Sequence, residues 1–208
     1  MKRIGLGSKL LFIVFVFSSF ISANLELIPL KIGQKMPRQF TRMRAVNETH
    51  YIIKDLYKEN GLCVIFSNNT CPFVVSWESR YNEIFELCVK NKIGFVVLNS
   101  NEDKRKGNDS FLEMQKRAKE KKYKFLYAED KNSKMADALG ALYTPEAFLF
   151  DKFQALEYKG AIDDNMKDEK LVKVAYLKNA IESLGKNRKA SIKETKIVGC
   201  DIKRLKEF

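Results

Sequence analysis

The sequence predicts an α/β fold in which a central mixed β-sheet is flanked by helices within a single domain. Two observations support this prediction. Short apolar runs alternate with segments of helical periodicity through the middle of the chain. Near the end, residues 147–150 and 156–159 follow each other closely, as in a hairpin, and a further helical segment comes after them. Strands joined by helices and completed by a hairpin form a sheet that helices cover on both faces.

The elements are expected in a regular order. Residues 24–45 contain Pro29, Gly33 and Pro37 and should form an extended lead-in, and residues 46–60 a short helix or an irregular cover. The expected strands are residues 62–66, 93–99, 125–127, 147–150 and 156–159. The expected helices are residues 72–91, 111–121, 134–142 with Ser133 as N-cap, and 169–184.

Both ends of the chain differ from its middle. Residues 1–23 have a basic start, an apolar run over residues 10–21 and a small residue, Ala23, at the end, which is typical of a signal peptide. We therefore expect an exported, periplasmic or secreted protein with no stable membrane span after signal removal; an uncleaved anchor is the alternative. Residues 24–185 should form the folded domain, and residues 186–208 a basic tail that carries Cys200.

The charge of the chain is strongly positive, with 38 Lys and Arg against 26 Asp and Glu among 208 residues and a formal net charge of +12. The cationic residues are spread out and no basic motif is interleaved with aromatic residues, so no nucleic-acid partner is expected. The lysines are better explained as solvated helix faces that can also attract an acidic partner.

The four cysteines fall into two groups. Cys63 lies in an apolar strand and Cys88 among apolar helix positions, so both are expected in the core. Cys71 and Cys200 lie in polar settings. The cysteine spacings match no zinc pattern and the single histidine, His50, is distant in sequence, so no metal or other cofactor is expected.

Cys71 is the leading candidate for a reactive residue. A strand breaks into the polar turn of residues 67–70, and Pro72 is suited to the first position of a helix. A thiol at a helix N-terminus is favoured as the reactive thiolate, with Thr70 and Asn69 able to hydrogen-bond it or to cap the helix. The alternative is a small buried hydrophobic residue.

A second signal is the pair Thr144 and Pro145, directly before a buried strand, where a cis peptide bond is possible. Together with the Cys-Pro helix start and the order of the elements, this pair points to a thioredoxin-like fold. In that fold the cis-proline loop packs beside the reactive cysteine and helps to hold an extended thiol substrate.

Several motifs extend the likeness over about residues 30–205. They are residues 68–74 (Asn-Asn-Thr-Cys-Pro-Phe-Val), 98–101 (Leu-Asn-Ser-Asn), 144–145 (Thr-Pro), 148–151 (Phe-Leu-Phe-Asp), 160–165 (Gly-Ala-Ile-Asp-Asp-Asn) and 194–203 (Glu-Thr-Lys-Ile-Val-Gly-Cys-Asp-Ile-Lys). In this combination the chain resembles the peroxiredoxin-like, or redoxin, branch of the thioredoxin superfamily, which is related to alkyl hydroperoxide reductases and thiol-specific antioxidant proteins.

The resemblance implies a thiol-dependent oxidoreductase. Cys71 would be the catalytic residue, and Thr70, Pro72, Thr144 and Pro145 would position the substrate. That substrate would be a thiol, a disulfide or a peroxide, with an external thiol as reductant.

The chain departs from the family pattern beside Cys71. Asn68 stands where the family has its first cysteine and Thr70 where it has a histidine, and Val74 excludes a second local cysteine. The peroxidase pattern Pro-x-x-x-Thr-x-x-Cys is also absent, since Val64 and Asn68 occupy its first two defined positions.

Cys200 is the remaining partner for Cys71 if the tail folds back. It could be a resolving cysteine, part of a structural disulfide or an unpaired thiol. Two hypotheses about function follow: an exported thiol-dependent oxidoreductase, or a redox-inactive thioredoxin-fold binding or scaffold protein.

Three further residues near these motifs are expected to have structural roles. Trp77 should pack in the core, and Asp163 and Asp164 should form a turn.

Overall fold

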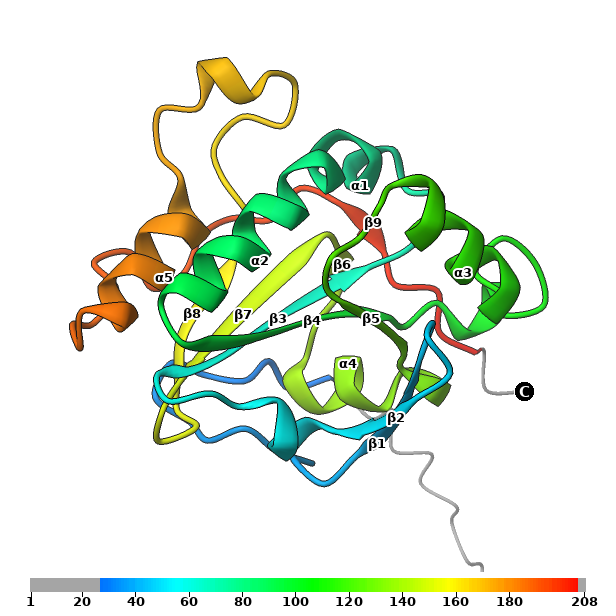
Figure 1. Cartoon of the computed structure of the whole chain (residues 1–208), viewed down its shortest axis with the longest axis horizontal. Helices are drawn as coiled ribbons and strands as arrows, with labels where there is room; N and C mark the ends of the chain where they lie inside the picture. Colours follow the sequence, from blue (N-terminus) through cyan, green and yellow to red (C-terminus); the bar gives the residue numbers. More distant parts are fainter. Residues whose placement is uncertain (1–26, 206–208) are drawn as a thin grey trace, which may run out of the picture.

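The computed structural model describes residues 27–205, and the predicted signal peptide lies outside them. Their centre is a seven-stranded sheet in the order β2-β1-β5-β4-β3-β7-β8 (Figure 1). Its strands are β1 (Arg42–Ala45), β2 (His50–Ile52), β3 (Gly61–Ser67), β4 (Ile93–Asn99), β5 (Leu126–Glu129), β7 (Glu146–Asp151) and β8 (Leu156–Gly160). The pairs β3–β4 and β4–β5 are parallel and the others antiparallel, so the sheet is mixed as predicted.

Five helices accompany the sheet in the described part of the chain. They are α1 (Pro72–Trp77), α2 (Tyr81–Lys90), α3 (Phe111–Glu120), α4 (Lys134–Leu139) and α5 (Tyr176–Gly185). Figure 1 shows α2 and α5 on one face of the sheet and α4 on the other. Short strands β6 (Tyr143–Thr144) and β9 (Cys200–Asp201) form a separate antiparallel pair.

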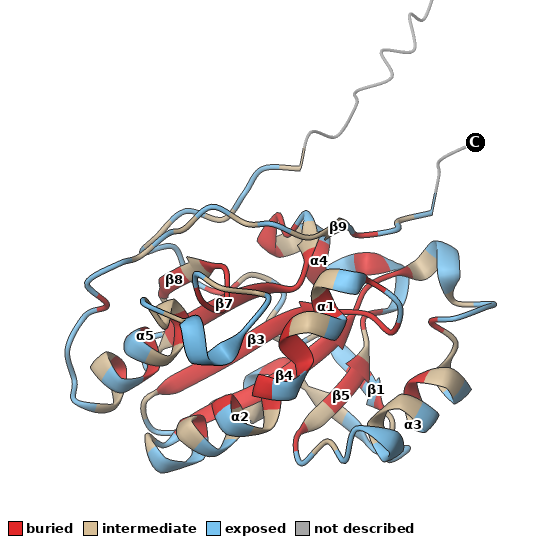
Figure 2. Cartoon of the chain, turned by 90° about the horizontal axis from the view of Figure 1, so that it is seen from above, coloured by how far each residue is buried: buried red, intermediate tan, exposed pale blue. Residues whose placement is uncertain are grey.

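The two faces of the sheet bury two separate apolar clusters. Alternate residues of β3 point to opposite faces, so Cys63 and Ile65 join the cluster under α2 and α5, while Val64 and Phe66 join the one under α4. Every residue of β3 and β4 is buried, and Figure 2 shows these strands beneath helices whose outer surfaces are exposed. Burial on both faces explains why these strands are continuous apolar runs in the sequence.

Residues 42–52 correct the first element prediction, because they form the hairpin β1–β2 where the end of an extended lead-in and the start of a short helix or irregular cover were expected. A short helix does follow, as the 3₁₀ turn Ile53–Leu56. The Asn47 side chain accepts hydrogen bonds from the backbone N–H and the hydroxyl of Thr49, which fixes the turn. β1 then pairs with β5, from a distant part of the chain. Such pairing leaves no local periodicity to detect.

Three predicted helices are also shorter or broken. The helix expected over residues 72–91 is interrupted at Glu78–Arg80 by a 3₁₀ turn whose Glu78 and Arg80 side chains are both buried. The helix expected from residue 169 begins at Tyr176, because Glu169–Leu171 is a separate 3₁₀ turn in which Leu171 is exposed.

The helix expected over residues 134–142 ends at Leu139, where Gly140 takes a left-handed conformation with φ of 66°. Ser133 does not cap this helix with its side chain; its hydroxyl donates to the Ser100 carbonyl. The Asp130 carboxylate accepts the N–H groups of Met135 and Ala136 instead. Asp130, three residues before the predicted Ser133, therefore supplies the side-chain cap of α4.

Candidate functional site

Cys71 and Cys200 are joined by a disulfide across 129 residues of sequence. Cys71 is the N-cap of α1, with Pro72 at the first position of that helix. Cys200 comes from the C-terminal tail, which crosses the molecule and places β9 beside β6 (Figure 1). Of the three states open to Cys200 on sequence grounds, the unpaired thiol is thus excluded in this structure.

The tail reaches Cys71 because it docks at two places along its path. Residues 193–195 run beside β8, where Lys159 donates its N–H to the Lys193 carbonyl and accepts that of Thr195. The Thr195 hydroxyl also contacts the Tyr158 hydroxyl and accepts the Ala161 N–H. Further along, Ile202 is 5% exposed and packs into the apolar cluster under α4.

Thr144 and Pro145 lie directly at the disulfide. The peptide bond between them is cis, and both residues are buried. The Thr144 carbonyl oxygen is 3.3 Å from the Cys71 sulfur. The Thr144 hydroxyl donates a hydrogen bond to the Cys200 carbonyl at 3.4 Å. Thr144 therefore contacts both cysteine-bearing segments.

Asn68 completes this arrangement, although the sequence singled it out only as a missing cysteine. Its side-chain amide donates to the Thr144 hydroxyl at 2.8 Å. Its side-chain carbonyl accepts the N–H groups of Cys71 at 2.7 Å and Thr70 at 3.1 Å. Asn68 thus fixes the turn before α1, whereas Asn69 and Thr70 were expected to hydrogen-bond the thiolate or to cap the helix. Thr70 and Pro72 are exposed beside the disulfide.

Asn69 belongs to a buried polar network that sequence analysis missed. Its N–H donates to the Asp109 carboxylate at 2.8 Å, and its side-chain carbonyl accepts the Tyr127 hydroxyl. The same carboxylate accepts the side-chain amides of Asn99 and Asn101. The side-chain carbonyl of Asn101 accepts the Lys203 N–H at 2.8 Å. The network therefore connects the Cys71 turn to the tail beyond Cys200.

Trp77, Arg80 and Asp163 form a second buried polar group. The Asp163 carboxylate accepts the Trp77 indole N–H at 2.9 Å and pairs with the Arg80 guanidinium, which also donates to the Asn165 carbonyl. The prediction that Trp77 only packs and that Asp163 only forms a turn was incomplete. Asp163 holds α1 and the following turn against the segment after β8.

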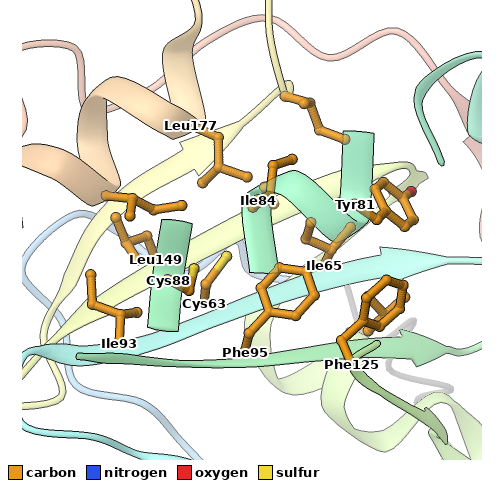
Figure 3. Close-up of a cluster of buried hydrophobic side chains, with 14 of the residues drawn as sticks. Cys63, Ile65, Tyr81, Ile84, Cys88, Ile93, Phe95, Phe125, Leu149 and Leu177 are labelled. Atoms are coloured by element: carbon orange, nitrogen blue, oxygen red, sulfur yellow. The ribbon is translucent and has the colours of Figure 1, made fainter. Parts of the chain in front are cut away.

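Cys63 and Cys88 are free and fully buried. Figure 3 shows their sulfur atoms pointing toward one another between β3 and α2. Burial, together with the neighbouring Cys63, raises the pKa of the Cys88 thiol well above its usual value. A thiol in this state is a poor nucleophile.

Within residues 27–205 no cluster of three or more His, Cys, Asp or Glu side chains is arranged to hold a metal ion. No helix in this described range is both long and apolar enough to cross a bilayer.

The mixed sheet, the helix that starts at Cys71 and the Thr144–Pro145 loop beside it define a thioredoxin-like fold. The structure is similar to those of a hypothetical protein from Sinorhizobium meliloti 1021 and an uncharacterized conserved protein from Geobacillus kaustophilus. For the first, the TM-score is 0.78 at 24% identity, over 86% of this chain and 98% of that one. For the second, the TM-score is 0.78 at 25% identity, over 86% of this chain and 95% of that one.

The structure is also similar to peroxidoxin BcpB from Mycobacterium tuberculosis, with a TM-score of 0.52 at 11% identity over 62% of this chain and 84% of that one. At this identity the likeness shows the fold alone. No protein-family model and no curated protein matches the sequence.

Proposed function

We propose that the protein is an exported thiol-dependent oxidoreductase that alternates between a Cys71 and Cys200 dithiol and the Cys71–Cys200 disulfide. The observation that supports this most directly is the disulfide itself, formed between the cysteine at the start of α1 and the tail, against the Thr144–Pro145 loop. Cys200 would then be the resolving cysteine.

Each turnover begins with the Cys71 thiolate, which attacks one sulfur of a substrate disulfide. A Cys71–substrate disulfide forms, and the other substrate sulfur leaves as a thiolate. The Cys200 thiolate then attacks the Cys71 sulfur, so that the Cys71–Cys200 disulfide forms and the substrate leaves as a dithiol. Two equivalents of an external thiol restore the protein dithiol and become one disulfide.

The residues around the disulfide support this sequence of steps. The Thr144 carbonyl oxygen, 3.3 Å from the Cys71 sulfur, can accept the proton of the reduced thiol. Asn68 holds the Cys71 backbone and Thr144 at a fixed separation, which keeps Cys71 and Cys200 together. The exposed Thr70 and Pro72 lie where an incoming substrate would first contact the protein.

A disulfide is a better candidate substrate than a peroxide. Asn68 stands at the position of the peroxidase threonine, but both ends of its amide are occupied by Thr144 and the backbone of residues 70 and 71. Arg80, the arginine nine residues after Cys71, is buried and paired with Asp163. Neither side chain is free to orient a peroxide.

The test compares reduced wild type, Cys71→Ser, Cys200→Ser and a control, Cys88→Ala, after addition of stoichiometric oxidised glutathione or hydrogen peroxide. Peptide mapping by mass spectrometry should find the Cys71–Cys200 disulfide in wild type and control, and a glutathione adduct on Cys71 in Cys200→Ser. Faster oxidation by peroxide, with sulfenic acid on Cys71, would instead support a peroxidase.

The second candidate is a redox-inactive binding or scaffold protein with a permanent bridge, which the burial of Cys71 at 3% exposure favours. It predicts a disulfide that glutathione buffers do not reduce and a Cys71→Ser variant that behaves as wild type. These results together would overturn the proposed function.

Export is proposed from the signal-peptide pattern of residues 1–23, which lie outside the described residues. Intact-mass measurement of the protein secreted by a bacterial host should show a chain that begins after Ala23. A full-length chain retained in the membrane fraction would contradict this part of the proposal and leave the chemistry at Cys71 unaffected.

A further inference from the structure

The residues around Cys200 bind the domain as an extended polypeptide would. Residues 199–204, which we call the strap, pair with β6 in antiparallel register, with Cys200 opposite Thr144 and Asp201 opposite Tyr143. The ladder continues where the Ile202 N–H donates to the Leu142 carbonyl at 2.9 Å. The cysteine of this extended segment is thereby delivered to Cys71.

Backbone groups provide most of this binding. Asp201 and Lys203 are exposed, and Ile202 is the strap's only apolar side chain in the core. Strand addition of this kind takes its affinity from main-chain hydrogen bonds and places few demands on sequence. Another extended segment with a cysteine can therefore make the same contacts with β6.

One position does restrict the sequence. A Cβ atom on Gly199 would lie 2.6 Å from the Thr144 carbonyl oxygen, closer than any side chain can approach without displacing the backbone. The residue before the cysteine must therefore be glycine for the segment to lie this close to β6.

The strap also controls access to Cys71. With the strap in place Cys71 is 3% exposed, and its sulfur is already bonded to that of Cys200. When the disulfide is reduced, the strap is held by the short ladder, the hydrogen bond from the Thr144 hydroxyl to the Cys200 carbonyl, Ile202 and the contacts of Lys203 and Arg204. A large substrate reaches Cys71 only by replacing the strap on β6.

We propose that the strap occupies the substrate position, and that the substrate is an extended polypeptide whose cysteine follows a glycine. The inference rests on the proposed function. The Cys71 thiolate attacks the disulfide sulfur of that cysteine while its segment pairs with β6, and the partner sulfur leaves as a thiolate. The strap then returns, Cys200 forms the Cys71–Cys200 disulfide, and the polypeptide leaves reduced.

The test uses reduced Cys200→Ser protein, in which the strap is present without its thiol. The probes are a peptide of residues 197–202 (Ile-Val-Gly-Cys-Asp-Ile) activated as its thionitrobenzoate disulfide, the same peptide with valine in place of glycine, and the small dinitrobenzoate disulfide. Attack by Cys71 releases coloured thionitrobenzoate, and mass spectrometry verifies the adduct. The glycine peptide should react about tenfold faster than the valine peptide.

Strap displacement is tested by adding Gly199→Val to the same protein. Because the new side chain forces the strap away from β6, the glycine peptide should react about tenfold faster still. Ile202→Ala is a second, independent way to loosen the strap and should act in the same direction. Gly107→Val is the matched control, since a Cβ there is 3.8 Å from its nearest neighbour.

The possible failures are distinguishable. Equal rates for both peptides, with no acceleration by Gly199→Val or Ile202→Ala, would overturn the substrate inference while reaction with the small disulfide left the proposed function intact. A Cys71 that reacts with none of the three disulfides in any variant would contradict the proposed function itself.

Discussion

Asn68 is a buried residue whose side chain links the Cys71 turn to the Thr144–Pro145 loop. It is 4% exposed and makes three hydrogen bonds, to the Thr144 hydroxyl and to the N–H groups of Thr70 and Cys71. A cysteine at this position would offer one weak donor in place of an amide with both donor and acceptor. Asn68 therefore stands where a local dithiol would need its other cysteine, and it also holds Cys71 and Thr144 in place.

The Asn68→Ala variant should lose stability, because the Thr144 hydroxyl and the Cys71 N–H would be buried without these partners. Unsatisfied buried groups cost about 1–3 kcal/mol, and urea unfolding of the oxidised protein measures the loss. Asn108→Ala, at an exposed side chain, is the control and should change the free energy of unfolding by less than about 0.5 kcal/mol. Equal values for the two variants would show that the Asn68 link contributes no stability.

Cys63 and Cys88 give a prediction that separates the four cysteines chemically. Both are fully buried and free, and burial raises the pKa of Cys88, so neither should react with a thiol reagent in the native oxidised protein. Denaturation should expose two thiols, and denaturation with reduction four. Two reactive thiols before denaturation would mean that the Cys71–Cys200 disulfide is absent.

At the scale of elements, the polar network around Asp109 holds the tail in place. β4 supplies Asn99, the turn after it supplies Asn101, and the Cys71 turn supplies Asn69. Asn101 then accepts the Lys203 N–H, three residues beyond Cys200. Two segments that are distant in sequence are thereby attached to one rigid strand end.

Asn101→Ala should weaken the Cys71–Cys200 disulfide without altering either cysteine. Loss of the hydrogen bond to Lys203 lowers the effective concentration of Cys200 at Cys71. The equilibrium constant for disulfide formation in glutathione buffers should therefore fall about tenfold, the equivalent of one buried hydrogen bond. Asn179→Ala, on the exposed side of α5, should leave it unchanged. An unchanged constant in Asn101→Ala would show that the tail docks independently of this network.

At the scale of the whole molecule, four tyrosine side chains, those of Tyr81, Tyr123, Tyr127 and Tyr158, lie wholly or partly buried in the core. Burial is the largest cause of a raised pKa for Tyr81, Tyr123, Tyr127 and Tyr158. The folded protein therefore retains protons that the unfolded chain releases above a pH of about 10. Because the folded state binds more protons there, its stability falls as the pH rises further.

Tyr81→Phe should make this alkaline loss of stability less steep. Well above its unfolded pKa, each such tyrosine costs about 1.4 kcal/mol of stability per pH unit. Between pH 10 and 11 the unfolded tyrosine is only partly ionised, so the variant should lose less stability by about 1 kcal/mol. Denaturant unfolding at both pH values measures it. Tyr51→Phe is the contrasting variant and should not reduce the loss, because hydrogen bonds with Thr49 and Asn47 lower the pKa of Tyr51 and its ionisation therefore favours the folded state. A slope unchanged in Tyr81→Phe would contradict the role assigned to burial.

The sequence by itself determined the mixed sheet, the strand–turn–helix that carries Cys71 and the position of Thr144–Pro145 before a buried strand. These features follow from local causes: apolar periodicity, burial on one or both sheet faces and the restricted backbone of proline. Boundaries that depend on distant partners, such as the β1–β2 hairpin and the break at Glu78–Arg80, did not follow from the sequence.

Only the tertiary structure decided how the site is assembled. The partner of Cys71 is 129 residues away, Asn68 donates to a residue 76 positions later, and Asn101 receives a bond from one 102 positions later. Contacts over such separations depend on which strand ends the topology brings together, and no local pattern of residues encodes that choice. Cys71 was therefore predictable as a candidate. Its pairing with Cys200, whose strap pairs with β6, depends on the tertiary structure.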